Sequence, residues 1–341
     1  MTGDRTSEHE RKAWNAARWT AGDVRGHYES WFSRANHPER PLAFWIRYTI
    51  FSPKSRPGDA LGELWAIAFD GEKKRVIAVK EEHSIRACTF SKTELSARIA
   101  DATHDHESLD GSAACAGHRI AWSLRFTSPD RPLLLLARPL YDAPFPKAKA
   151  VVGSPHAVFS GTFRVDDEDW SIDGWTGSQN HNWGERHTTR YAWGQVAGFD
   201  DAPDAFLEVI TAQVKLGPWT TPRMTPLVLR LGDEELAFNT LGRALRADGR
   251  YDLFQWHFET GDDRAHVSGT IAAAASDFVG LTYYDPPGGS RTCLNSKIAR
   301  CDVTVRRPGK APLSLSTRSR AAFEILTTAT DHGIRILDPK A

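Results

Sequence analysis

The sequence predicts an all-β protein made of two tandem antiparallel β-barrel or β-sandwich domains. Short runs of alternating apolar and polar residues recur along the 341-residue chain, and turn-forming Gly, Asp and Pro residues separate them. No segment shows a sustained helical period. A proline-rich stretch without periodicity, at residues 140–155, splits the runs into two series and predicts the domain boundary.

We therefore expect a flexible segment at residues 1–22, a first barrel-like domain at residues 23–150 and a second at residues 151–341. The period of two is clearest at residues 43–50, which predicts a strand. Residues 63–69 and 75–80 flank an Asp-Gly turn and predict a hairpin. The remaining expected strands of the two series are at residues 119–126, 131–138, 157–165, 170–174, 189–199, 206–215, 227–231, 236–239, 253–259, 266–273, 276–285 and 298–305.

Charge and cysteine content narrow the partners and the compartment. Lys and Arg together number 43, as do Asp and Glu, so no net charge favours nucleic acid as a partner. The four cysteines show no CxxC spacing, which favours a reduced cytoplasm. The N-terminus is charged and lacks the apolar core of a signal peptide. The longest apolar run, residues 133–137, is far short of the ~20 residues of a membrane span. We expect a cytoplasmic protein without a transmembrane segment.

Residues 174–200 hold the densest group of chemically useful side chains. Gly174, Gly177 and Gly184 predict a loop that turns the intervening residues inward, and residues 189–199 predict a strand. On that strand the side chains of Tyr191 and Trp193 share one face with those of Gln195, Ala197 and Phe199, whereas the other face is almost bare. Either face is a candidate wall for an apolar ligand cavity, and close approach of a neighbouring sheet is the alternative reading of the bare face.

The next expected strand places Glu208 among apolar neighbours. A buried carboxylate is costly unless it is paired or protonated. Pairing with Arg186 or Arg190 is one solution. A raised pKa and a role as proton donor is the other.

His181 lies between Asn180 and Asn182, and hydrogen bonds from these amides suit either an acid/base group or a structural histidine. No metal-ligand pattern and no nucleotide-binding or serine-hydrolase motif is present in the sequence. We therefore expect no metal and no cofactor.

Several segments resemble one protein family. The core match, residues 180–184 (Asn-His-Asn-Trp-Gly) followed by residues 191–195 (Tyr-Ala-Trp-Gly-Gln), resembles the two-domain lipocalin-like family of acyclic carotenoid 1,2-hydratases (hydroxyneurosporene synthase-like), distantly related to tocopherol cyclases and fungal Diels-Alderase-type cyclases. Residues 159–162, 283–285 and 293–296 add weaker likeness. The resemblance implies lipocalin-like domains and a role in activity for His181 and Trp183. The family's Tyr-x-Asp pair has no counterpart on the following strand, where Glu208 is the nearest carboxylate after Asp200 and Asp204.

The chemistry implied by the resemblance is acid-catalysed hydration or cyclisation of a hydrophobic isoprenoid-type molecule, with transient membrane contact for its uptake. Protonating an alkene requires a carboxylic acid of raised pKa, and aromatic faces stabilise the carbocation. The expected catalytic residues are His181, Trp183 and Glu208. The expected substrate-binding residues are Trp175, Asn180, Asn182, Tyr191, Trp193 and Asp285. Asp200 and Asp285 are alternatives to Glu208 as the proton donor. A non-catalytic lipid or terpenoid carrier and a purely structural β-protein are the alternatives.

Overall fold

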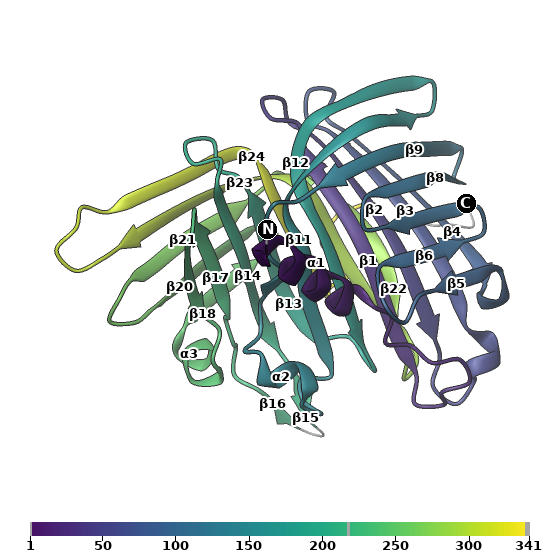
Figure 1. Ribbon diagram of the computed structural model, residues 1–341, viewed down its shortest axis with the longest axis horizontal. Helices are drawn as coiled ribbons and strands as arrows, with labels where there is room; N and C mark the ends of the chain where they lie inside the picture. The colour runs from purple at the N-terminus through teal and green to yellow at the C-terminus, as the bar shows by residue number, and fades with distance from the viewer. Residues whose placement is uncertain (1, 217–218, 338–341) are drawn as a thin grey trace.

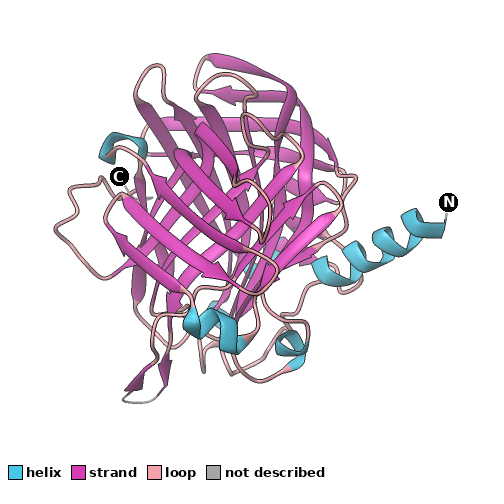
Figure 2. Cartoon of the chain, turned by 90° about the vertical axis from the view of Figure 1, so that its left-hand side faces the viewer, coloured by secondary structure: helices cyan, strands magenta, loops and turns pink. Residues whose placement is uncertain are grey.

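The computed structural model describes residues 2–216 and 219–337, and strands make up most of it (Figure 2). Two large antiparallel sheets lie side by side, which confirms the all-β fold of two tandem sheet bodies (Figure 1). In its described part, no helix is long and apolar enough to cross a membrane.

The first sheet has twelve strands. In hydrogen-bonded order they are β4 (Arg75–Ser84), β3 (Leu61–Asp70), β2 (Leu42–Ser52), β1 (His27–Asn36), β12 (Glu168–Gly184), β11 (Ala148–Val165), β9 (His118–Thr127), β8 (Ser108–Cys115), β7 (Ala102–Asp105), β6 (Ser96–Ile99) and β5 (Cys88–Phe90), with β10 (Leu133–Leu134) paired to β11. The sheet curls into a barrel-like body, because β4 reaches β8 through a hydrogen bond from the Ala114 amide to Glu81.

The second sheet has ten strands. In order they are β18 (Glu234–Phe238), β17 (Leu227–Leu231), β14 (Ala205–Gln213), β13 (Arg190–Ala197), β24 (Leu313–Thr327), β23 (Ser290–Arg306), β21 (His266–Ala272), β20 (Gln255–Gly261) and β19 (Asp248–Asp252), with β22 (Val279–Tyr284) paired to β23. The remaining elements are the hairpin β15 (Lys215–Leu216) and β16 (Trp219–Thr220), the α-helices α1 (Thr2–Asn15), α2 (Pro139–Asp142) and α3 (Leu241–Arg246), and the 3-10 turns Pro57–Asp59, Ile85–Ala87 and Ala275–Asp277.

The sheets divide the chain after Gly184, whereas the sequence placed the boundary near residue 150. The proline-rich stretch is an excursion through α2, after which the chain returns to the first sheet as β11 and β12. Such an excursion and a linker between domains have the same sequence signal, namely prolines and a loss of periodicity. The Asn-His-Asn-Trp-Gly motif therefore lies at the end of the first sheet, where β12 pairs with β1.

Residues 174–184 form the second half of strand β12, although their glycines predicted a loop. Two of these glycines permit close strand approach. A side chain at Gly177 would collide with the carbonyl oxygen of Arg34, and one at Gly184 would collide with that of Lys147. Because β12 is a strand, successive residues point to opposite faces of the sheet. This alternation decides which motif residues reach the space between the sheets.

Four apolar clusters hold the described part of the fold together, and three of them are large. One fills the first sheet body, with Phe44 and Tyr48 of β2 among its members, and a second fills the other body. The third lies between the sheets and joins Trp45 of β2 to Trp193 of β13. Strand β2 is therefore buried on both faces. Large apolar residues occupy one face, and Trp45 and Arg47 lie on the other.

Strand β13 has the two-faced pattern expected from the sequence. Trp193 faces the first sheet, while Ala192 and Val196 face the core of the second. A side chain at Gly194 would collide with Ile271, so the bare face allows the second core to pack closely behind the strand. Phe199 belongs to that core too, because the strand ends at Ala197 and the alternation stops there.

Candidate active site

A cavity of about 210 Å³ lies between the two sheets, with walls from both. Its first-sheet wall comes from β1, β2, β11 and β12, and its second-sheet wall from β13, β14, β22 and β24. The aromatic, charged and amide side chains of the wall include those of Tyr28, Phe32, Trp45, Arg47, Asn180, Asn182, His187, Tyr191, Trp193, Glu208, Tyr283 and Glu324. The lining is mainly apolar and aromatic with a few polar groups, which is typical of a small-molecule site.

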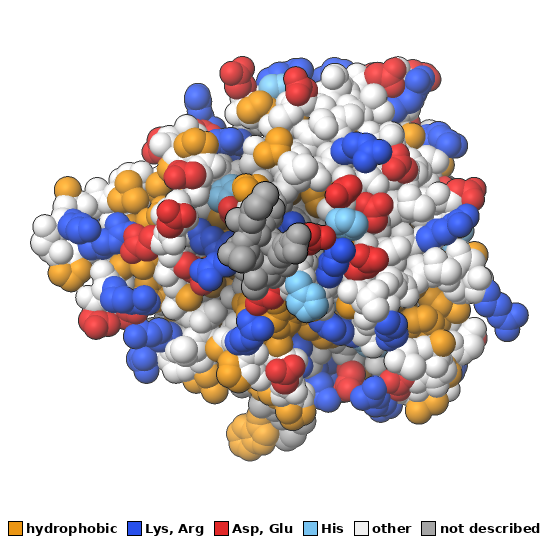
Figure 3. All heavy atoms as spheres, in the orientation of Figure 1, with side chains coloured by type: hydrophobic (Ala, Val, Ile, Leu, Met, Phe, Trp, Pro, Cys, Tyr) orange, Lys and Arg blue, Asp and Glu red, His pale blue; other side chains and the backbone are white. Residues whose placement is uncertain are grey.

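The outer part of the cavity is apolar. Leu140 and Phe145 line it from the α2 segment, Met224 from the chain between β16 and β17, and Leu241 from α3. Leu241 is exposed, and the other three are half-buried. In the space-filling view, hydrophobic side chains gather over the lower part of the face, where Figure 1 places α2 and the β15–β16 hairpin (Figure 3). The cavity lining therefore reaches the surface at Leu241.

Glu208 is the titratable group at the centre of the second-sheet wall. Its side chain projects from β14 into the cavity and is only 3% exposed. Trp193 Nε1 donates to Oε1 at 2.8 Å, and Gln195 Nε2 donates to Oε2 at 2.8 Å. Burial raises the pKa of Glu208 to about 7, although these hydrogen bonds and the charge of Arg34 act in the opposite direction. The carboxyl group is therefore able to carry a proton near neutral pH.

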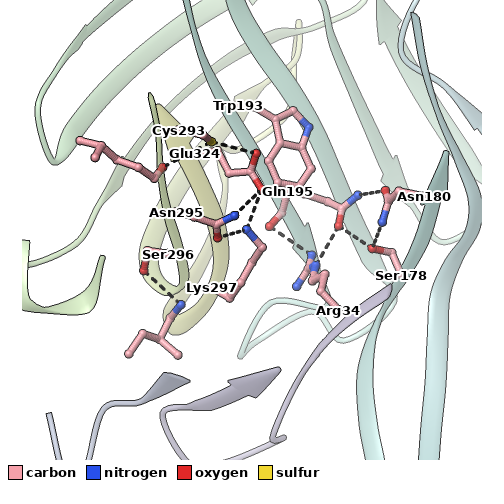
Figure 4. Close-up of polar contacts among 12 residues, drawn as sticks. Arg34, Ser178, Asn180, Trp193, Gln195, Cys293, Asn295, Ser296, Lys297 and Glu324 are labelled. Atoms are coloured by element: carbon pink, nitrogen blue, oxygen red, sulfur yellow. Dashed lines mark hydrogen bonds and ion pairs between the residues drawn. The ribbon is translucent and has the colours of Figure 1, made fainter. Parts of the chain in front are cut away.

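The orientation of Gln195 is set by Arg34, which reaches it from β1 of the first sheet (Figure 4). Arg34 Nε donates to Gln195 Oε1 at 2.8 Å, and Ser178 Oγ donates to the same oxygen at 2.6 Å. Because a guanidinium can only donate, the amide oxygen must face Arg34. The amide nitrogen then faces Glu208 and Asn180, whose Oδ1 accepts at 2.9 Å.

A second buried polar group borders the cavity at Glu324 of β24. Lys297 Nζ lies 2.8 Å from Oε1 of Glu324, and Asn295 Nδ2 donates to the same oxygen at 3.0 Å (Figure 4). Tyr191 Oη donates to Oε2 at 3.5 Å. The carboxylate of Glu324 is thus held in an ion pair, in contrast to that of Glu208.

Two further residues line the cavity beside Tyr283. The Arg47 guanidinium lies over the Tyr283 ring, 4.4 Å from its centroid. The His187 ring stacks on Tyr28 at 3.9 Å between centroids. Burial, with the charge of Arg47 as a smaller contribution, lowers the pKa of His187 to about 3, so this imidazole is neutral at physiological pH.

His181 and Trp183 project from β12 to the face opposite the cavity. His181 Nε2 lies 2.8 Å from Oε1 of Glu29, and its Nδ1 lies 2.7 Å from the carbonyl oxygen of Trp14, just before the end of α1. The imidazole is fully buried, stacks on Trp31 and lies 4.7 Å from Trp183 with its ring tilted. Both ring nitrogens are occupied by acceptors, so His181 ties the N-terminal segment to the first sheet.

The structure brings together five of the nine residues predicted for the site: Asn180, Asn182, Tyr191, Trp193 and Glu208 line the cavity. Asp285 lies next to it, where it accepts a hydrogen bond from the His187 amide at 3.0 Å. Trp175 packs in the first core against Phe44, away from the cavity.

Sequence reasoning missed the part of the first-sheet wall that comes from β1 and β2. The alternation at residues 43–50 puts Trp45 and Arg47 on one face of the strand, but nothing in the local sequence indicates that this face meets the second sheet. A charged residue among large apolar ones on that face was the available signal. Within residues 2–216 and 219–337, no group of three or more His, Cys, Asp or Glu residues is placed to hold a metal ion.

Comparison with known proteins gives a likeness of fold. No family model matches the chain, and no curated protein matches it in sequence. Solved structures do match. A candidate AttH of Nitrosomonas europaea superposes with a TM-score of 0.56 at 12% identity, covering 92% of this chain and 96% of that one.

Two other solved structures are similar over most of their length. CghA with Sch210972 has a TM-score of 0.55 at 11% identity, covering 89% of this chain and 88% of that one. Kievitone hydratase of Nectria haematococca has a TM-score of 0.50 at 8% identity, covering 88% and 89%. This chain therefore has the lipocalin-like, two-sheet fold of these proteins.

Proposed function

We propose that this protein is an enzyme in which Glu208 protonates a carbon–carbon double bond of a hydrophobic, isoprenoid-type molecule, as a hydratase or a cyclase. The observation that carries the proposal is a buried carboxyl group with a pKa of about 7 in the wall of an aromatic cavity. A general acid works best when its pKa lies near the operating pH. One of the proteins with a similar fold is named a hydratase, which agrees with one form of the proposal.

The hydrogen bonds around Glu208 support delivery of its proton to a ligand. Trp193 and Gln195 both donate to the carboxyl oxygens, and Gln195 is held in this orientation by Arg34. When Glu208 is neutral, neither partner can accept its proton, and the hydroxyl is left to point into the cavity. After proton transfer, the same two donors stabilise the carboxylate that forms.

The remaining wall suits a carbocation. Trp45 and Trp193 line the cavity together with Phe32 and Tyr28, and Phe32 meets Trp193 edge to face at 6.0 Å between centroids. Aromatic faces attract cations more strongly where water is excluded. The aromatic residues on both walls would stabilise positive charge that develops after protonation.

Both forms of the reaction are balanced without a cofactor. In hydration, one alkene carbon takes the Glu208 proton, water oxygen bonds to the carbocation, and that oxygen returns a proton to the carboxylate. In cyclisation, a second double bond of the same molecule attacks the carbocation, and a C–H proton returns to Glu208. Asn182 lines the cavity and makes no side-chain hydrogen bond with a described residue, so it is available to hold the water.

We assign His181 and Trp183 a structural role rather than the catalytic one expected from the sequence, since they project from the other face of β12. The alternative of a non-catalytic carrier is supported by the apolar lining of the cavity. A cytoplasmic location and transient membrane contact stay predictions of the sequence.

Isotope incorporation separates these functions. The purified protein would be incubated with farnesol and with farnesoic acid in H2¹⁸O and in D2O, and compounds that co-purify with it would be analysed by mass spectrometry. A hydratase adds one ¹⁸O and one carbon-bound deuterium, and a cyclase yields an isomer with deuterium but no ¹⁸O. Recovery of every compound unchanged, including the co-purified one, would support the carrier.

A further inference from the structure

We infer that the cavity has a second polar subsite, centred on Arg47, that binds an anionic oxygen group of the ligand. The inference rests on the proposed function in one respect, namely that the cavity is the ligand site. Arg47 projects from β2 into the cavity and is 6% exposed. No carboxylate of the described residues lies within ion-pair distance of it, and its Nε is buried without a hydrogen-bond acceptor.

The neighbouring carboxylates are already paired with lysines. Glu63 of β3 forms an ion pair with Lys80 at 2.6 Å, and Glu324 of β24 forms one with Lys297 at 2.8 Å. Both carboxylates act on Arg47 only as more distant charges. Lys80 also pairs with Glu82 at 2.6 Å, so each of these three carboxylates has a lysine partner and none of them pairs directly with Arg47. A buried charge such as that of Arg47 is costly in an apolar interior unless a partner compensates it.

The groups nearest Arg47 supply no anion. Its guanidinium lies over the ring of Tyr283 and 5.9 Å from the Trp45 centroid, so aromatic faces provide partial compensation. The Tyr283 hydroxyl is buried, and its neighbour is the Cys293 thiol, whose pKa is raised by burial. His187 is neutral for the reason given above. A ligand oxygen could receive hydrogen bonds from Arg47 and from the Tyr283 hydroxyl.

Arg47 and Glu208 contact different residues of the same cavity. Glu208 is held by Trp193 and Gln195, whereas Arg47 rests on Tyr283. The cavity also contains Lys149, but its ammonium donates to the Ala143 carbonyl and its side chain is half-exposed. The arrangement suits an apolar molecule with one carboxylate or acidic enol at Arg47 and its double bond at Glu208. Arginine is well suited to oxyanions because its planar fork donates two hydrogen bonds together.

Binding of a matched pair of probes tests this inference. Farnesoate and farnesol share one hydrocarbon chain and differ in the terminal oxygen group, and their binding would be followed by tryptophan fluorescence at pH 8. We expect farnesoate to bind about tenfold more tightly, the factor typical of a charged hydrogen bond. Arg47→Met should remove this preference, and Arg47→Lys should keep part of it. Without ligand, Arg47→Met should remain folded, because Arg47 forms no ion pair with a described residue.

Arg230→Met is the matched control. Arg230 is also 6% exposed, but it donates to the carbonyls of Arg131 and Pro132 and pairs with Glu235 outside the cavity. Its replacement should lower the melting temperature and leave the preference for farnesoate unchanged. Equal binding of both probes by the parent protein, or an unchanged preference in Arg47→Met, would overturn the inference.

Glu208→Gln separates this inference from the proposed function. It should retain the preference for farnesoate while losing turnover. Preference without turnover in the parent protein would reject catalysis and keep the Arg47 subsite. Turnover that depends on Glu208, without any preference for farnesoate over farnesol, would keep catalysis and reject the Arg47 subsite. Binding of neither probe would reject both.

Discussion

Glu29 and Glu208 are two buried carboxyl groups that lie on opposite sides of β12 and differ greatly in acidity. Glu29 is fully buried and Glu208 is 3% exposed, so burial raises the pKa of both. Yet the pKa of Glu29 is lowered to about 2, whereas that of Glu208 is raised to about 7. Depth of burial alone therefore does not decide whether a carboxyl group carries a proton.

The hydrogen-bond and ion-pair partners of each carboxyl group decide its protonation state. Glu29 lies 2.8 Å from His181 Nε2 and 2.9 Å from His27 Nε2, and it also accepts from the amides of Arg18 and Trp19 at 2.6 and 2.7 Å. Glu208 accepts from two neutral side chains, and its nearest strong charge, Arg34, is directed to Gln195 instead. Four donors stabilise an anion that anchors the N-terminal segment. Two neutral donors leave an acid that can release and regain a proton.

Glu208→Gln should give the largest effect. We expect turnover of an identified substrate to fall by about 10²- to 10⁴-fold, the usual contribution of a general acid, while ligand binding persists. Steady-state kinetics and equilibrium binding would measure the two quantities. Glu29→Gln serves as control, because this buried carboxyl group lies outside the cavity, and folded Glu29→Gln should turn over normally. Full activity in Glu208→Gln would reject the proposed mechanism.

Glu29→Gln should instead destabilise the fold. Its removal leaves His181 and His27 without their anionic partner, and we expect the free energy of unfolding at pH 7 to fall by about 3 kcal/mol. Chemical denaturation would measure the change. The pKa of Glu29 is lowered on folding, so its contribution is present above pH 4.5 and lost as the pH falls toward 2. A loss as large at pH 2 as at pH 7 would contradict this account.

The pH dependence of stability should show the opposite sign for Glu208. Its pKa rises from 4.5 in the unfolded chain to about 7 in the fold, so the folded state retains a proton that the unfolded state loses. The free energy of unfolding should then fall by up to about 3 kcal/mol between pH 4.5 and 7 and level off above pH 7. Denaturation of the parent protein and Glu208→Gln across this range isolates the contribution, since the variant should lack it. Parallel curves would show that Glu208 ionises normally.

Trp193→Phe should have the smallest effect. The ring remains, but Glu208 loses a donor that favours its charged form, and we expect its pKa to rise by up to about one unit. The alkaline limb of the pH–rate profile should move upward by the same amount. Trp45→Phe is the matched control, because Trp45 lines the same cavity and its indole nitrogen has no hydrogen-bond partner in the described chain. A shift in both variants would mean that the hydrogen bond to Glu208 is not its cause.

The sequence predicted the parts of this site that depend on local alternation. The faces of β13 and the burial of Glu208 on β14 follow from period-two patterns, and the raised pKa of Glu208 follows from its apolar neighbours. The alternative in which Arg186 or Arg190 pairs with Glu208 is wrong, because the hydrogen bonds to Glu208 come from Trp193 and Gln195. Arg34 lies far away in the sequence and reaches Gln195 only because the two sheets pack face to face.

Pairing between distant strands could not be predicted. Gly177 and Gly184 read as turn residues, but their lack of a side chain serves the close approach of β1 and β11 to β12. Once β12 is a strand, Asn180 and Asn182 face the cavity while His181 and Trp183 face away. A motif identifies the residues that lie together in sequence, whereas strand geometry sorts them onto two surfaces with different surroundings.

The contact between Arg34 and Gln195 has a consequence for how such a protein can change over evolutionary time. The acid stands on one sheet, and the group that fixes its hydrogen-bond donor stands on the other. Replacing only one half by that of a distant homologue would remove one partner of the Arg34–Gln195 hydrogen bond, and with it the contact that orients Gln195 toward Glu208. The two halves are therefore constrained to diverge together at this contact, while the apolar residues at the outer part of the cavity are free to vary with the ligand.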